Sequence, residues 1–292
     1  MLNNYTYKDN QFETQEKLFD FLRQNKNIFK IEKKSSLKKA DAIVANLFQI
    51  TDNVIKAIET NTLLEKDVLQ VALAINTTNI MDSHDDVHIS NLWNKSLKEQ
   101  KFLNLLQEHQ MTFEKIISDN VKALVQMMTW KTLGYDFTGN TQVLVFNTSI
   151  EKSRNEFMFN QYAKGYVRNH SVGMRYISLA LAMNSNSPYD VEEKKIWDKY
   201  YPEIVNSELP MQKGFFWAVT EAQLIEGSAV VLGSNYATPV ISVKENRQLS
   251  SNIEDTTNEA VKTDTSKDSH QQTESENDQR KKDYLLKIYT KK

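Results

Sequence analysis

The chain has 292 residues, of which 40% are hydrophobic and 10% aromatic, and this is enough apolar material for a substantial core. Its 36 basic and 38 acidic side chains give a formal net charge of −2, which argues against a protein whose direct partner is nucleic acid. The absence of cysteine excludes a disulfide framework, a zinc–thiolate site and a cysteine nucleophile. The lack of a signal-peptide pattern or a long apolar stretch predicts a soluble, cytoplasmic protein with no membrane partner.

The spacing of apolar residues predicts helices and strands along most of the chain. In chain order we expect a helix over 13–30, a basic connector over 33–39, a helix over 51–65, a strand over 67–78, a helix over 92–110, strands over 121–131 and 141–148, a helix over 151–169, a strand over 171–183, a helix over 194–205 and two strand-like runs within 215–243. The last two runs are expected to break at 226–227 and at 233–235, where glycine interrupts the apolar pattern.

Composition divides the chain into three expected parts: an N-terminal helical extension over 1–66, a folded domain over 67–244 and a polar tail over 245–292. Residues 245–282 hold only four apolar side chains and no aromatic one, too few to offset an ordering cost of about 1–2 kcal/mol per residue, and so predict disorder. The last ten residues can place Tyr284, Leu285, Ile288 and Tyr289 on one face of a short amphipathic helix. Such an end is either a docking peptide or an incidental frayed terminus.

The segment MDSHDDVHIS contains four potential metal ligands. In an extended conformation Asp82, His84, Asp86 and His88 project to one side, because side chains alternate along a strand. Two imidazoles and two carboxylates suit zinc or manganese. A polar run of this kind is more often a solvated loop, and no further ligand group is identifiable elsewhere, so we expect neither a metal nor another cofactor.

A candidate nucleophile lies in the run YAKGYVRNHSVGMRY, where Ser171 stands at a predicted helix-to-strand junction. A nucleophilic serine needs an exposed hydroxyl and nearby N–H groups that stabilise an oxyanion, and Gly173 permits close approach of a substrate backbone. His170 is a poor general base for Ser171, because consecutive side chains of an extended segment point to opposite faces. His109 is the best of the remaining histidines. Taken alone, the Ser-Val-Gly motif is also compatible with a buried structural serine.

Three segments in this order resemble the tailed-phage prohead maturation proteases, serine peptidases related to the herpesvirus assemblins. They are LLQEH around His109, YAKGYVRNHSVGM around Ser171 and LIEGSAVVLGSNYATPV around Glu226. The run VLQVALAINTTNIMDSHDDVHIS matches the opening strand and Asp-rich turn of that family, which argues further against a metal site. The resemblance covers about residues 67–243. The sequence after His109, QMTFEKIISDN, departs from the family pattern of an acidic residue and a short Pro/Gly turn.

The resemblance implies a catalytic triad of Ser171 as nucleophile, His109 as general base and Glu226 as the acid that orients it. The chemistry of these residue types agrees, because histidine titrates near pH 6.5 and an unpaired glutamate on an apolar strand would be costly to bury. Arg168 and Arg175 flank the serine. They either stabilise the oxyanion or bind the peptide backbone of a substrate, or they form surface ion pairs.

The fold that the resemblance implies is α+β, with a curved, mostly antiparallel sheet or small β-barrel surrounded by helices. The implied activity is that of a serine endopeptidase which cleaves scaffold, or the scaffolding segment of the major capsid protein, and itself. It would act inside the assembling procapsid in the host cytoplasm, with a homodimer as a further expectation. One alternative is a non-catalytic assembly protein that retains the fold, and another is a metal-dependent hydrolase that uses the Asp82–His88 segment.

Overall fold

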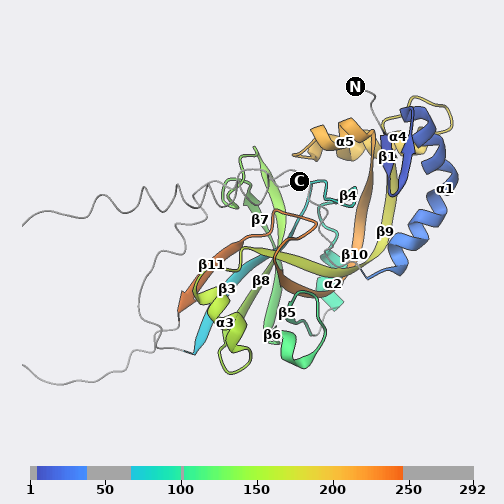
Figure 1. Ribbon diagram of the computed structural model, residues 1–292. Helices are drawn as coiled ribbons and strands as arrows, with labels where there is room; N and C mark the ends of the chain where they lie inside the picture. The colour runs from blue at the N-terminus through green and yellow to red at the C-terminus, as the bar shows by residue number, and fades with distance from the viewer. Residues whose placement is uncertain (1–4, 38–66, 100–101, 246–292) are drawn as a thin grey trace, which may run out of the picture. The chain divides into compact units, whose positions relative to one another are not determined.

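The computed structural model describes residues 5–37, 67–99 and 102–245 (Figure 1). The fold is α+β, with mostly antiparallel sheets and a few helices. The predicted helix over 51–65, the polar tail beyond residue 245 and its terminal amphipathic segment lie outside the described residues. None of the described helices has the length and apolar character needed to cross a bilayer.

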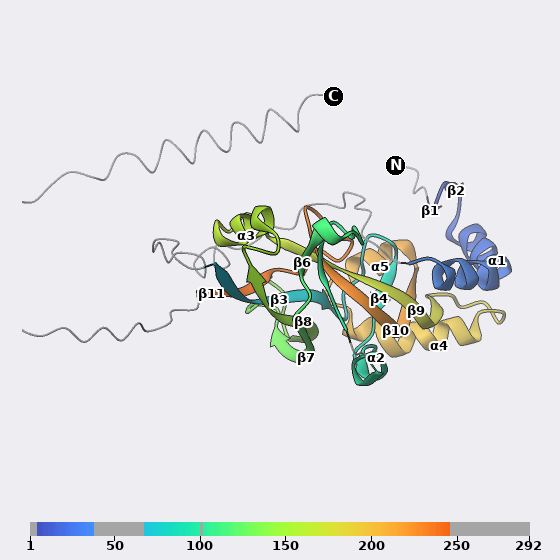
Figure 2. The same cartoon turned by 90° about the horizontal axis from the view of Figure 1, so that it is seen from below.

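The described elements are strands and helices, of which α1 is the longest helix (Figure 2). In chain order they are β1 (Tyr5–Tyr7), β2 (Asn10–Phe12), α1 (Gln15–Ser35), β3 (Val68–Thr77), β4 (Asp86–His88), α2 (Asn94–Glu99), β5 (Leu105–Gln107), η2 (Phe113–Lys115), β6 (Ile116–Ser118), β7 (Val121–Thr129), β8 (Asn140–Glu151), α3 (Glu156–Ala163), β9 (Asn169–Met183), α4 (Val191–Tyr200), η3 (Tyr201–Glu203), α5 (Glu208–Lys213), β10 (Phe215–Val230) and β11 (Val240–Glu245). Helix α1 and strands β3, β7, β8 and β9 confirm the predictions for their segments, within a few residues at each end.

The long strand β10 organises one sheet. Strand β9 pairs with it antiparallel along almost its whole length, and β4 and β5 pair with it in parallel at two separate places. Strand β6 extends this sheet beyond β5. A second, antiparallel sheet has the order β11-β3-β8-β7, and β1 and β2 form a small hairpin. Within the described residues these sheets do not close into a barrel.

The two larger sheets press together at Gly227 of β10. A Cβ atom at this position would lie 2.5 Å from a ring carbon of Phe146 and 3.2 Å from Ile75 Cδ1. Phe146 lies on β8 and Ile75 on β3, so the glycine lets the backbone of β10 approach the second sheet closely. The predicted break at 226–227 is therefore wrong: β10 runs through it, and the glycine serves packing rather than a turn.

The predicted helix over 92–110 is also wrong beyond its first turns. Among the described residues of this segment only Asn94–Glu99 are helical, and Leu105–Gln107 form β5. The leucines of β5 are buried, and the strand is paired on both edges, with β10 and with β6. Tertiary pairing thus decides the conformation of a segment whose apolar spacing favours a helix.

Helix α1 packs into the same core as the sheet of β9 and β10. It begins after the N-cap Thr14, whose side chain accepts the Lys17 N–H at 3.3 Å, and buries an apolar stripe of four residues. These are Leu18, Phe19, Leu22 and Phe29. The predicted basic connector is wrong at its start, because α1 continues through Ser35 and buries Lys33.

Candidate functional site

Three neighbouring strands carry the predicted triad residues, and the structure hydrogen-bonds two of them, His109 and Glu226, to each other. Ser171 lies on β9, Glu226 lies on β10, and His109 follows the end of β5. Strand β10 lies between the other two, with Ser228 opposite Ser171 of β9 on one edge and opposite Leu106 of β5 on the other. Residues far apart in the sequence therefore meet around one segment of β10.

A β-bulge in β10 decides which face Glu226 occupies. Leu224 pairs with Met174 and Glu226 pairs with Gly173, so Ile225 is an extra residue on β10. Without the bulge Glu226 would share the face of Leu224, which is buried in the core beside Met174. The bulge places Glu226 on the face of Ser171 instead.

His109 and Glu226 form a buried, hydrogen-bonded pair. His109 Nδ1 lies 2.6 Å from Glu226 Oε1, and the two side chains are 5% and 2% exposed. Because a carboxylate only accepts hydrogen bonds, Nδ1 is the nitrogen that carries the proton in this contact. That tautomer makes Nε2 the nitrogen suited to accept a proton from a hydroxyl group.

Ser228 is a residue of the candidate site for which the sequence motifs predicted no role. Its Oγ donates to Glu226 Oε2 at 2.7 Å and accepts the backbone N–H of His109 at 3.1 Å, and the residue is fully buried. Strand alternation was the available signal, because Ser228 stands two residues after Glu226 and so shares its face. Ser228 joins the second carboxylate oxygen to the backbone that carries the imidazole.

The turn that presents His109 has an unusual backbone. Glu108 and His109 both adopt left-handed conformations, with φ of +50° and +57°, and the N–H of Gln110 donates to the carbonyl of Gln107 at 3.0 Å. This is the geometry of a tight hairpin turn that asparagine and glycine normally occupy. Such strain persists only where the surroundings impose it, and it clusters at functional sites.

Gly173 makes room for the carboxylate. A Cβ atom there would overlap Glu226 Oε1, so the glycine leaves the space in which the Glu226 side chain lies. The sequence suggested this space for a substrate backbone, whereas in the structure the glutamate fills it. Any side chain at this position would displace Glu226.

Ser171 is 7% exposed and lines a small cavity of about 20 Å³. A cavity of this size has room for about one water molecule. The wall includes Asp82, His84, Tyr176 and Asn235. Among the residues that the structure describes, no hydrogen-bond partner is found for Ser171 Oγ, and neither His109 nor Glu226 lines this cavity.

His170, next to the serine, is a structural histidine. It is fully buried, with Nε2 lying 3.0 Å from the Tyr162 hydroxyl and Nδ1 lying 3.0 Å from the carbonyl of Thr238. Burial lowers the pKa of His170 to about 4, so the imidazole is neutral near pH 7. Its contacts and its place on the opposite face of β9 from Ser171 agree with its exclusion as the base.

The two arginines beside the serine are exposed, and neither forms an ion pair with another described residue. Arg175 lies on β9 with the same parity as Ser171 and Gly173, so it extends from the same face of the strand. Arg168 precedes β9. An oxyanion or peptide-binding role for either stays a prediction.

The Asp-rich segment is a turn rather than an extended run, so the predicted alignment of its four side chains is wrong. Asp82 Oδ1 accepts the N–H groups of His84 and Asp86 at 2.8 and 3.0 Å, and Asp85 is left-handed with φ of +62°. Asp86 instead pairs with a lysine of α1. Over residues 5–37, 67–99 and 102–245, no group of three or more His, Asp or Glu side chains is arranged to hold a metal ion.

The comparisons with known proteins leave the function to be inferred from these residues. No family model, no curated protein and no solved structure matches the chain.

Proposed function

We propose that the chain is a serine endopeptidase that matures the procapsid of a tailed phage, with Ser171, His109 and Glu226 as its catalytic triad. The observation that carries this proposal is the buried bond between His109 Nδ1 and Glu226 Oε1, formed beside the strand of Ser171. A histidine whose Nδ1–H is held by a carboxylate can serve as the base of acyl transfer, which further requires its Nε2 to come within hydrogen-bond reach of Ser171 Oγ.

The mechanism follows from these positions. Ser171 Oγ attacks the carbonyl carbon of the scissile peptide bond while His109 Nε2 takes the hydroxyl proton, and Glu226 stabilises the resulting imidazolium. The tetrahedral intermediate collapses, the C–N bond breaks, and His109 gives its proton to the leaving amine. Water then attacks the acyl-enzyme with His109 again as base, which releases the acid and restores Ser171. Backbone N–H groups near Ser171 would stabilise the oxyanion.

The phage part of the proposal is supported by the order of the three motifs and by the antiparallel β9–β10 pair on which two of them lie. It includes an assemblin-like curved sheet as the finer description of the fold. The substrates would be scaffold or the scaffolding segment of the major capsid protein, and the chain itself. The site of action would be the interior of the procapsid in the host cytoplasm, with a homodimer as a further possibility to test.

Co-expression with the major capsid protein of the same genome tests the proposal. We expect defined cleavage products in mass spectra with the native chain, and none with Ser171→Ala or His109→Gln. Ser178→Ala, which removes an exposed hydroxyl from the same strand, is the matched control and should leave the products unchanged.

Two results would contradict the proposal in different ways. If Ser171→Ala gives the native products, Ser171 is not the nucleophile. If shells assemble and no variant yields any product, the chain is a non-catalytic assembly protein.

A further inference from the structure

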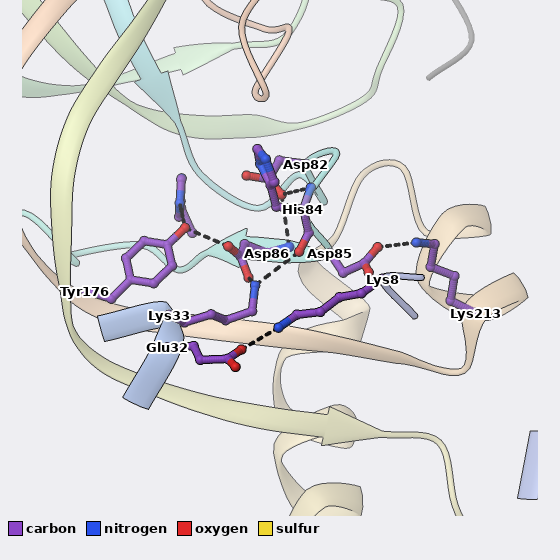
Figure 3. A network of polar contacts seen from close by, with 10 residues as sticks. Lys8, Glu32, Lys33, Asp82, His84, Asp85, Asp86, Tyr176 and Lys213 are labelled. Atoms are coloured by element: carbon purple, nitrogen blue, oxygen red, sulfur yellow. Dashed lines mark hydrogen bonds and ion pairs between the residues drawn. The ribbon is translucent and has the colours of Figure 1, made fainter. Parts of the chain in front are cut away.

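A buried ion pair joins the end of α1 to the turn formed by Asp82–Asp86 (Figure 3). Lys33, near the C-terminus of α1, pairs with Asp86, and its Nζ also donates to the carbonyl of His84 at 3.2 Å. The Lys33 side chain is 9% exposed and that of Asp86 is 0% exposed. A carboxylate in such a place depends on its cation, because removal of one partner leaves an uncompensated buried charge.

From Asp86 the polar contacts continue to β9, the strand that carries Ser171. The hydroxyl of Tyr176 donates to Asp86 Oδ2 at 2.8 Å and lies 3.3 Å from His88 Nε2. His88 Nδ1 in turn lies 2.8 Å from the side-chain amide of Asn76, near the end of β3. One buried network therefore connects α1 with three strands.

The turn is also held on its other side. Asp85 forms an ion pair with Lys213 at the end of α5, while Asp82 accepts the two backbone N–H groups that close the turn (Figure 3). Lys33 further lies 5.7 Å from the ring centre of Trp217 on β10. The conformation of the turn thus depends on one cation from each of two helices.

This turn and Tyr176 are part of the wall of the cavity beside Ser171. Asp82, His84, His88 and Tyr176 line it together with the serine. Tyr176 alternates with Ser171 and Gly173 along β9, so its side chain lies on the opposite face of the strand from Glu226, and the network acts on Ser171 through the backbone of β9.

We propose that Lys33 is a positioning residue of the protease site: through Asp86 and Tyr176 it fixes strand β9, and thereby the position of Ser171 on that strand. This role presupposes the peptidase activity proposed above. It makes α1, which lies outside the span of the three sequence motifs, part of the active enzyme.

The test is the rate at which a fluorophosphonate probe labels Ser171 in the full chain assembled with capsid protein. In this reaction Ser171 Oγ bonds to phosphorus, fluoride leaves with the P–F electron pair, and His109 takes the serine proton. We expect Lys33→Met to slow labelling at least about tenfold, since misplacement of a reacting group carries such penalties. Lys33→Arg should restore most of the rate, and Lys34→Met, which changes the exposed neighbour, should label like the native chain.

A core truncation in the same helix separates positioning from general stability. Leu22 is fully buried in α1 and has no polar side-chain group to join the network, so Leu22→Ala lowers stability alone. If Leu22→Ala, with an equal or larger loss of Tm, slows labelling as much as Lys33→Met while both remain folded by circular dichroism, the proposal is overturned. If Lys33→Met does not fold, the double variant Lys33→Met/Asp86→Asn replaces it, and labelling of that variant at the native rate also overturns the proposal.

Failure of the peptidase assignment gives a different result. If the native chain is not labelled at Ser171, the proposed activity fails, and the role of Lys33 with it. If the native chain and Lys33→Met are labelled equally fast, only the role of Lys33 fails.

Discussion

Glu226 is held at both carboxylate oxygens, and this fixes the direction of the imidazole that it orients. One oxygen bonds to His109 Nδ1 and the other accepts the hydroxyl of Ser228, which also accepts the His109 backbone N–H. The missing side chain of Gly173 leaves space for the carboxylate. His109 is therefore positioned through its backbone as well as through its ring.

Ser228→Ala removes both of these contacts at once. It leaves a buried carboxylate oxygen and a buried N–H unpaired, at a cost of about 1–3 kcal/mol in the free energy of unfolding. Because the imidazole loses part of its support, we expect the cleavage rate to fall by about 10²-fold. Urea denaturation and initial cleavage rates measure the two effects, and a native rate in a folded Ser228→Ala variant would show that the hydroxyl does not position His109.

Among single residues, the pairing of His109 with Glu226 was predictable from the motifs, and the residues that support this pair were not. The motifs indicated Ser171, His109 and Glu226, and the structure hydrogen-bonds the last two to each other. Lys33 was assigned to a connector because its partner, Asp86, is 53 residues away in the sequence. Local periodicity contains no information on contacts of that separation.

At the scale of elements, the candidate site depends on two irregularities. The bulge at Ile225 brings Glu226 to the face of β10 that carries Ser228, and the left-handed pair Glu108–His109 turns the imidazole toward it. Neither could be predicted from the sequence, because the turn lacks the usual Asn-Gly signal and a bulge is defined only by pairing with another strand. Strand β5 was missed for the same reason, being three residues long and defined by its neighbours.

Glu108→Gly relieves strain in the turn. Glu108 is exposed with φ of +50°, a conformation that glycine adopts without steric penalty, so we expect the free energy of unfolding to rise by about 1 kcal/mol. Cleavage should persist, because the His109–Glu226 bond is untouched. Glu192→Gly, at an exposed position of α4, should instead lower the free energy of unfolding by about 1 kcal/mol. Equal destabilisation by both variants in urea denaturation would mean that the turn is not strained.

At the scale of the whole molecule, two buried titratable groups act on stability in opposite directions. Burial lowers the pKa of His170 to about 4, so its contribution is complete above the unfolded value near 6.5 and is lost as the pH falls toward 4. Burial, together with the nearby Asp86, raises the pKa of Asp82 to about 7. The contribution of Asp82 is complete below its unfolded pKa of 3.8 and is lost as the pH rises toward 7.

Two variants separate these contributions. We expect the free energy of unfolding of His170→Gln, relative to the native chain, to increase as the pH falls from about 6.5 to about 4, by a total of about 3 kcal/mol. Asp82→Asn should show the opposite trend over the same interval. Urea denaturation at several pH values measures both, and curves that run parallel to the native one would contradict the assignment of these shifts.

The arrangement of the candidate site depends on the correct pairing of strand β10. Its pairing with β5 and β9 brings His109 and Ser171 to Glu226 in a single register. A chain in which β10 has slipped by one residue presents Gly227 where the carboxylate belongs. If the proposed triad is the active site, a misfolded copy of this kind lacks its carboxylate and is inactive, so a peptidase built in this way would not digest its surroundings before it has folded.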